Sequence, residues 1–296
     1  MATDAQRLGI RYVGGPTALL RVGGLHLLTD PTFDPPGEHP VGDRVLHKTA
    51  GPAVGPQGLG AVDAVLLSHD QHPDNLDTLG RAYLTGVPLV LSTASAQDRL
   101  GGNVQALATW TSVELPRPGG RALQVTGVPA QHGPDGSEHL VGEVTGFVLG
   151  GQDLPTVYVS GDNASLDVVR AIADRVGPVD VAVLFAGAAR TALASGAYLT
   201  LTTQAAAEAA KLLGARAVVP LHFEGWTHFT QGRDSLLAAF DDAGLADRLH
   251  LPEPDDPKEL TARRCSTAIP TRRRRPGRVV GACRGGGPSP PCRCRR

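Results

Sequence analysis

Short runs of apolar residues recur along the first 260 positions, and each run ends abruptly in polar residues. Several runs are apolar throughout, which is typical of strands covered by helices on both faces. Segments with helical periodicity lie between them. This rhythm predicts an α/β fold. The expected strands are 17–22, 25–29, 62–67, 88–91, 124–128, 145–149, 157–160, 179–185 and 217–221, and the expected helices are 75–84, 166–176, 204–213 and 235–243.

Two further features of the sequence, a pair of similar segments and a Gly-Gly pair, bear on the architecture. Residues 62–67 (VDAVLL) resemble residues 179–184 (VDVAVL), and each reads as a buried strand introduced by Val-Asp. This weak internal similarity hints at two similar halves. Gly23-Gly24, between the first two expected strands, predicts a hairpin.

The composition changes at about Thr261, where Arg, Gly, Pro and Cys replace the apolar periodicity. We therefore expect a domain over 1–260 and a disordered tail over 261–296. Two alternatives stay open for the tail. It is a frameshift product of a GC-rich gene, or it is a nucleic-acid arm or a metal site that uses Cys292 and Cys294.

The net charge of -1 conceals an uneven distribution. The tail holds 11 Arg and no acidic residue, so the first 260 residues carry 17 basic and 29 acidic ones. An acidic domain argues against nucleic-acid binding except through the basic tail. All four cysteines also lie in the tail, which excludes a disulfide framework or cysteine-ligated metal from the domain.

The N-terminus lacks the pattern of a secretory signal, and no apolar run approaches the roughly 18 residues of a membrane span. These observations predict a cytoplasmic protein without a membrane span.

The segment that follows the expected strand 62–67 carries candidate chemistry. His69, His72 and Asp74 stand within six residues of one another. Imidazole nitrogens and a carboxylate that converge in a tight turn are what a zinc-type cation needs. The alternative is that Asp74 caps the next helix and that the histidines are surface residues.

Three later positions favour the metal interpretation, because His132, Asp162 and His222 each end an apolar run. Polar groups at the carboxyl ends of strands lie where α/β folds place their sites. Four His and two Asp in such positions predict one or two bound divalent metal ions.

With these motifs and the early Thr29-Asp30-Pro31, the sequence over about 9–255 resembles the metallo-β-lactamase-fold hydrolases. Within them it is most similar to the branch of the ascorbate-phosphate lactonases and N-acyl-phosphatidylethanolamine phospholipase D type enzymes. The resemblance implies a four-layer αββα sandwich with one or two metals, usually zinc. It implies His69, His72 and His132 as ligands of the first metal, Asp74 and His222 as ligands of the second, and Asp162 as the bridge.

One segment departs from the usual His-x-His-x-Asp-His of that family. The loop reads His-x-x-His-x-Asp-Asn, so a one-residue bulge is needed to bring His72 and Asp74 into register. Without the bulge, Gln71 and Pro73 would occupy ligand positions and disable the site. Asn75 stands where the last histidine is expected, and Asn is a poor ligand beside imidazole. The second metal is then weak, absent or replaced by Mn or Fe.

The hypothesis for function is a metal-dependent hydrolase in which a metal lowers the pKa of a bound water, giving a hydroxide that attacks an ester, lactone or phosphodiester. The absence of Gly-x-Ser-x-Gly leaves a serine hydrolase without support. The body has no basic cluster for a polyanion, which favours a small neutral or singly charged substrate. The alternative is a catalytically degenerate member of the fold that binds a ligand or partner.

Further residues are assigned supporting roles. Asp74 would orient the attacking hydroxide, and His228 would donate a proton or bind an anionic group. Asp30 either accepts a hydrogen bond from a ligating imidazole or is a turn residue before Pro31. Trp226 either stacks on the substrate or packs in the core.

Overall fold

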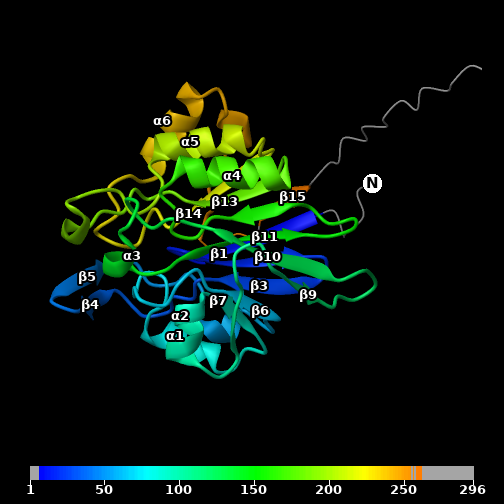
Figure 1. The fold of residues 1–296 in the computed structure, drawn as a ribbon, viewed down its shortest axis with the longest axis horizontal. Coiled ribbons are helices and arrows are strands. Elements are labelled where there is room, and N and C mark those ends of the chain that lie inside the picture. The colour runs from blue at the N-terminus through cyan, green and yellow to red at the C-terminus, as the bar shows by residue number, and fades with distance from the viewer. Residues whose placement is uncertain (1–6, 255, 257, 262–296) are drawn as a thin grey trace, which may run out of the picture. The chain divides into compact units, whose positions relative to one another are not determined.

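The computed structural model describes residues 7–254, 256 and 258–261, which form four layers: helices, a sheet, a second sheet and helices (Figure 1). The αββα sandwich expected from the sequence is confirmed. The helices are α1 (Thr78–Leu84), α2 (Ala94–Leu100), α3 (Glu138–Val141), α4 (Leu166–Val176), α5 (Thr203–Leu212) and α6 (Arg233–Asp242), with short 3-10 helices at η2 (Pro56–Gly58), η3 (Ala192–Ala194) and η4 (Ala246–Arg248). The strands are β1 (Arg7–Gly14), β2 (Thr17–Val22), β3 (Leu25–Thr29), β4 (Gly37–Val41), β5 (Arg44–Lys48), β6 (Ala64–Leu66), β7 (Val90–Ser92), β8 (Val104–Ala106), β9 (Ser112–Leu115), β10 (Leu123–Pro129), β11 (Thr145–Gly150), β12 (Val157–Val159), β13 (Val181–Phe185), β14 (Ala217–Leu221) and β15 (Lys258–Thr261).

Two sheets stack in the middle of the sandwich. Over the described residues, one sheet has the order β15-β1-β2-β3-β6-β7-β8 and the other has the order β14-β13-β12-β11-β10-β9. Strands β12, β13 and β14 are parallel to one another, and β10 runs in the same direction because two antiparallel pairings through β11 separate it from β12. The carboxyl ends of these four strands therefore meet at one edge.

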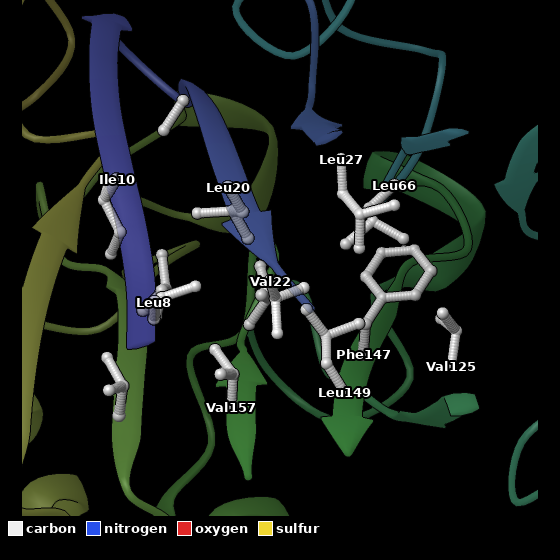
Figure 2. Close-up of a cluster of buried hydrophobic side chains, with 14 of the residues drawn as sticks. Leu8, Ile10, Leu20, Val22, Leu27, Leu66, Val125, Phe147, Leu149 and Val157 are labelled. Atoms are coloured by element: carbon white, nitrogen blue, oxygen red, sulfur yellow. The ribbon is translucent and has the colours of Figure 1, made fainter. Parts of the chain in front are cut away.

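Three apolar clusters hold the layers together. The cluster between the sheets contains Leu20 and Leu66 from one sheet and Val125 and Phe147 from the other (Figure 2). A second cluster packs α4, α5 and α6 on one sheet, and a third packs α1 on the other.

Strand β13 shows why the apolar runs do not alternate. Val183 and Phe185 belong to the cluster between the sheets, whereas Ala182 and Leu184 belong to the cluster under the helices. Both faces of the strand are buried, so each position is apolar.

The helices begin at residues that supply a cap. Ser165 accepts a hydrogen bond from the backbone N–H of Val168 at the start of α4, and Thr202 does the same for Ala205 in α5. The expected helix 75–84 was wrong at its start: α1 begins at Thr78, because Asp77 is its cap and accepts from the backbone N–H of Gly80.

Other expectations on the elements need correction. Strand 88–91 is displaced to β7 at Val90–Ser92. The hairpin β4–β5 was not expected, because nine of its ten positions are exposed or half-buried and it carries a proline and several charged residues. It pairs with neither main sheet in the part of the chain that the structure describes. Of the expected tail 261–296, all but Thr261 lies outside the described residues.

Candidate metal centre

The loop after β6 carries three of the expected ligands and is fixed at several points. The backbone N–H groups of Asn75 and Leu76 donate to the carbonyl of His72 at 3.1 and 2.9 Å, which closes a tight turn. The buried carboxylate of Asp70 accepts from Arg99 Nε at 2.9 Å and from its Nη2 at 2.5 Å, which ties the loop to α2. The loop conformation therefore depends on residues that are not candidate ligands.

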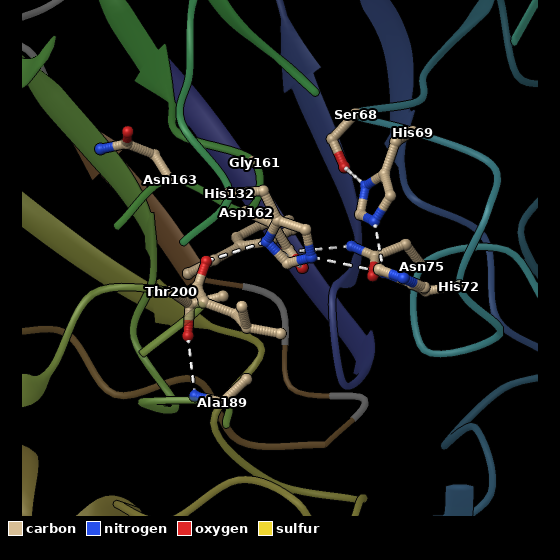
Figure 3. Close-up of polar contacts among 12 residues, drawn as sticks. Ser68, His69, His72, Asn75, His132, Gly161, Asp162, Asn163, Ala189 and Thr200 are labelled. Carbon is tan, nitrogen blue, oxygen red and sulfur yellow. Dashed lines mark hydrogen bonds and ion pairs between the residues drawn. The ribbon is translucent and has the colours of Figure 1, made fainter. Parts of the chain in front are cut away.

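Three imidazoles converge in this region (Figure 3). His69 Nε2 lies 3.0 Å from His72 Nδ1, and His132 Nε2 lies 3.3 Å from the same atom. His132 comes from the end of β10, on the other sheet. The histidine cluster, His69–His72–His132, thus joins residues from both sheets.

Hydrogen bonds on the far side of the ring orient two of these histidines, His69 and His132. His132 Nδ1 lies 2.9 Å from the carbonyl oxygen of Leu199, which can only accept, so this nitrogen carries the proton. The Ser68 hydroxyl donates to Asp30 Oδ2 at 2.8 Å, so it accepts from His69 Nδ1 at 3.0 Å. In both rings the lone pair is left on Nε2, which faces the cluster.

The geometry corrects the expectation for Asp30. The carboxylate does not reach an imidazole directly; it accepts from the backbone N–H of Ser68 at 2.6 Å and acts on His69 through the Ser68 hydroxyl. Ser68 was not singled out from the sequence, because a lone serine after a strand carries no signal of such a role.

A second group consists of Asp74, Asp162 and His222, all buried. His222 Nε2 lies 3.2 Å from Asp74 Oδ2, and its Nδ1 lies 3.7 Å from Asp162 Oδ1. Neither ring nitrogen of His222 has a hydrogen-bond partner, although the ring is fully buried. A buried imidazole that meets carboxylates only at ion-pair distance and forms no hydrogen bond is costly unless something else satisfies it. A divalent cation held with these two carboxylates would do so.

Asn75 contacts the second group without being placed among its ligand atoms. Its Nδ2 donates to Asp162 Oδ1 at 3.1 Å and lies 3.4 Å from Asp30 Oδ2. The amide orientation follows from this environment, since the opposite one would point an oxygen at two carboxylates. Asn75 therefore holds the proposed bridging carboxylate in position.

The bulged alignment of the loop agrees with the placement of its side chains. His72 lies in the histidine cluster, whereas the Gln71 amide packs so closely on Gly142 that a Cβ there would meet it at 2.4 Å. The structure thus brings His72 and Asp74 to the site and turns Gln71 away.

The protonation of the two groups differs. Burial, followed by the charges of neighbouring imidazoles, lowers the pKa of His69 well below its ordinary value and the pKa of His132 to about 3. Burial raises the pKa of Asp162 to about 6 and that of Asp30 to about 7. Burial would also raise the pKa of Asp74, but His228 and His222 outweigh it and lower the value.

The end of β12 and the loop after β6, which carry members of the two ligand groups, approach each other closely at Gly161. Gly161, directly before Asp162, has φ +56°, and a Cβ there would lie 2.7 Å from the Thr145 carbonyl oxygen and 2.8 Å from Ser68 Cβ. Only glycine fits this position. The contact places the end of β12 against the loop after β6.

His228 and Trp226 lie in different surroundings. His228 Nε2 lies 2.9 Å from Asp74 Oδ2, and its ring lines a small pocket of about 30 Å³ beside the metal-ligand candidates. Trp226 is buried and lines a different cavity of about 300 Å³, with Lys48 Nζ 5.6 Å from its ring centroid. The Trp226 ring also meets the His228 ring edge to face, with centroids 6.0 Å apart, so both roles considered for Trp226 stay predictions.

The small pocket is also bordered by residues that sequence reasoning missed. Arg44 of β5 and Arg190 line it, together with apolar residues. The sequence offers no signal for them, because they come from a hairpin and a loop that only the tertiary fold brings to the site.

Three imidazoles whose nitrogens lie within 4.8 Å of one another, beside two carboxylates and a buried histidine that forms no hydrogen bond, fit a centre for one or two divalent metals. Together with the αββα sandwich, this donor set is that of a metallohydrolase.

Comparisons with known proteins agree with this class. A family model described as "Beta-lactamase superfamily domain" matches residues 26–223. A UPF0173 metal-dependent hydrolase of Rubrobacter xylanophilus is 30% identical over 224 residues, which cover 72% of this chain and 81% of that protein. One from Pyrococcus horikoshii is 26% identical over 178 residues, which cover 59% and 72% of the two chains.

Solved structures share the fold. An isothiocyanate hydrolase from Delia radicum gut bacteria matches with TM-score 0.71 and 22% identity, over 86% of this chain and 99% of that one. A possible metal-dependent hydrolase from Veillonella parvula matches with TM-score 0.73 and 17% identity, over 85% and 99%.

The chain therefore belongs to the metallo-β-lactamase superfamily, and the two relatives described above are named metal-dependent hydrolases. Among the described residues, no helix has both the length and the apolar character needed to cross a bilayer.

Proposed function

We propose that this protein hydrolyses a small ester, lactone or phosphodiester with one or two divalent metal ions, zinc before Mn or Fe. The observation that carries the proposal is the histidine cluster, in which His69 Nε2 and His132 Nε2, each with its lone pair facing inward, lie 3.0 and 3.3 Å from His72 Nδ1. Such a set of neutral nitrogen donors suits zinc. The narrower resemblance to lactonases and to N-acyl-phosphatidylethanolamine phospholipase D type enzymes belongs to the same proposal.

The proposed ligands divide as the sequence resemblance implies. His69, His72 and His132 would hold the first metal, Asp74 and His222 the second, and Asp162 would bridge them. A bound divalent metal would supply Lewis-acid activation of a water molecule and polarisation of the substrate oxygen.

The chain's own residues would orient the ligands and move a proton. Asp30 and Ser68 keep the proton of His69 on Nδ1, and Leu199 does the same for His132. Asn75 holds Asp162 in place by its hydrogen bond. His228 would move a proton between the pocket and Asp74, because its Nε2 bonds to that carboxylate while its Nδ1 has no partner.

Asn75 bears on how strongly a second metal would bind. A hydrogen-bond donor to Asp162 replaces the imidazole expected at this position, so the second ion would have one nitrogen ligand fewer. We propose that the second metal binds more weakly than the first.

Metal content by elemental analysis of the purified protein tests the proposal, together with His132→Ala, Asp162→Asn and the control His250→Ala. His250 is half-buried and lies outside both ligand groups. Hydrolysis of a lactone, a phosphodiester and an isothiocyanate is followed in parallel. The isothiocyanate is included because a solved structure with this fold is named an isothiocyanate hydrolase.

We expect one to two metals per chain, with metal and hydrolysis both reduced in the first two variants and retained in His250→Ala. A folded protein that takes up no metal after reconstitution would contradict the proposal. It would leave a degenerate member of the fold that binds a ligand or partner.

A further inference from the structure

Two arginines border the small pocket beside the proposed metal ligands. Arg44 lies at the start of β5, and Arg190 lies in the segment that follows β13. The carboxylates among the lining residues are those of Asp74 and Asp162, both candidate metal ligands. The rest of the lining is half polar and half apolar: His72, His132, Thr191 and His228, with Leu46, Val141, Ala189 and Leu199.

Neutral groups hold both guanidinium groups in place. Arg44 Nη1 donates to Thr191 Oγ1 at 2.6 Å. Arg190 Nε donates to the carbonyl oxygen of Gly196 at 2.6 Å, and its guanidinium lies 4.8 Å from the ring centroid of Tyr198. These contacts fix the position of each side chain without neutralising its charge.

Within the part of the chain that the structure describes, no Asp or Glu forms an ion pair with either arginine. Arg99 differs, since its charge is matched by Asp70. In an otherwise acidic domain, two unpaired cations thus face one small pocket.

We infer that Arg44 and Arg190 form an anion-binding subsite that holds a carboxylate of the substrate while its scissile bond lies over the metal ligands. The inference rests on the proposed hydrolase function and narrows its substrate to a carboxylate-bearing molecule. Guanidinium groups offer paired N–H donors that match the two oxygens of a carboxylate. The apolar residues of the same pocket would contact the part of the substrate that links the carboxylate to the reacting group.

A matched pair of esters tests the subsite: mono(4-nitrophenyl) adipate and 4-nitrophenyl hexanoate. They share a leaving group and an acyl chain of equal length and differ in one terminal carboxylate. The ratio of kcat/KM for the anionic to the neutral ester is measured for the metal-loaded protein. It is then measured for Arg44→Gln, Arg190→Gln, Arg44→Lys and the control Arg170→Gln. Arg170 lies on α4 and pairs with Asp167.

We expect the unaltered protein to prefer the anionic ester and each Gln variant to lose about tenfold to a hundredfold of that ratio, since a charge-assisted hydrogen bond contributes this much. Arg44→Lys should retain part of the preference, and Arg170→Gln should retain all of it. A protein that does not prefer the anionic ester would overturn the inference. So would a preference that persists in both Gln variants.

A binding measurement separates this inference from the proposed function. Calorimetric titration of the metal-free protein with monomethyl adipate reports the subsite without any hydrolysis. Weaker binding by about tenfold in Arg44→Gln and Arg190→Gln supports the subsite, even if neither ester is cleaved and the hydrolase proposal fails. Absence of binding, or binding that both Gln variants retain, overturns it. Inorganic phosphate serves as a second probe, and tighter binding of phosphate than of the carboxylate would overturn the assignment to a carboxylate.

Discussion

At the scale of single residues, the proposed ligands depend on neighbours that are not ligands. Ser68 and Leu199 fix the protons of His69 and His132 on the far side of each ring. Asn75 gives Asp162 its hydrogen bond. The site is therefore oriented before any metal arrives, which lowers the entropic cost of assembling the ligands.

Lowering the pH from 8 to 6 is expected to weaken metal binding more at Asp74–Asp162–His222 than at the histidine cluster. Burial raises the pKa of Asp162 to about 6. Burial alone would lower the pKa of His222, but Asp162 and Asp74 outweigh it and raise the value. Both groups therefore carry protons at pH 6 that a metal must displace, whereas His132, with a pKa of about 3, is neutral at both pH values.

Zinc titrations by calorimetry at the two pH values check this prediction. The affinity of the weaker site should fall several-fold, because protons compete with the metal below the pKa. Titration in two buffers of different ionisation enthalpy should show proton release on binding at that site. Equal losses of affinity at the two sites would contradict the difference in protonation.

At the scale of elements, turns at the ends of strands bring the ligands together. The end of β12 approaches the loop after β6 through Gly161, at a distance that admits no Cβ. The carboxyl ends of β10, β12 and β14 carry His132, Asp162 and His222 at the same edge. The junction at Gly161 thus determines how closely the two ligand groups can meet.

Gly161→Ala is expected to reduce the free energy of unfolding by about 3–5 kcal/mol, combining the strain of a positive φ with overpacking. Gly177→Ala is the control. It also has a positive φ, +79°, but no atom within 4 Å of the added Cβ, so about 1–2 kcal/mol is expected. Urea denaturation of the metal-free proteins measures both. Equal losses would show that Gly161 matters only for its backbone conformation.

At the scale of the whole molecule, the candidate metal centre spans both sheets. His69, His72 and Asp74 follow β6 in one sheet, and the remaining proposed ligands follow strands of the other. A metal bound there would add a link between layers that otherwise meet through apolar packing. Metal binding should therefore stabilise the entire domain, not only its site.

Zinc at a hundred times its Kd is expected to stabilise the folded protein by about 2.7 kcal/mol, or roughly 5–10 °C in Tm for a domain of this size. Thermal melts with zinc and with EDTA measure the difference. The shift should disappear in His132→Ala and persist in His250→Ala. A shift of equal size in His132→Ala would place the bound zinc elsewhere.

The sequence alone predicted an α/β fold and the six candidate ligands. Apolar runs such as 179–185 predict buried strands because both faces of β13 are covered. The polar residue at the end of each run predicts its place at the edge of a sheet. The family resemblance then gave the fold and the six proposed ligands, from the spacing of short motifs.

Only the tertiary structure showed the contacts between residues that are distant in sequence. In the loop after β6, His72 and not Gln71 joins His69, and Gln71 packs against Gly142, more than sixty residues away in sequence. Asp30 acts through Ser68 instead of directly on a ring. Arg44 and Arg190 face the pocket because a hairpin and a loop approach it from separate parts of the chain. Contacts between residues distant in sequence leave no local pattern, so periodicity and motifs do not reveal them.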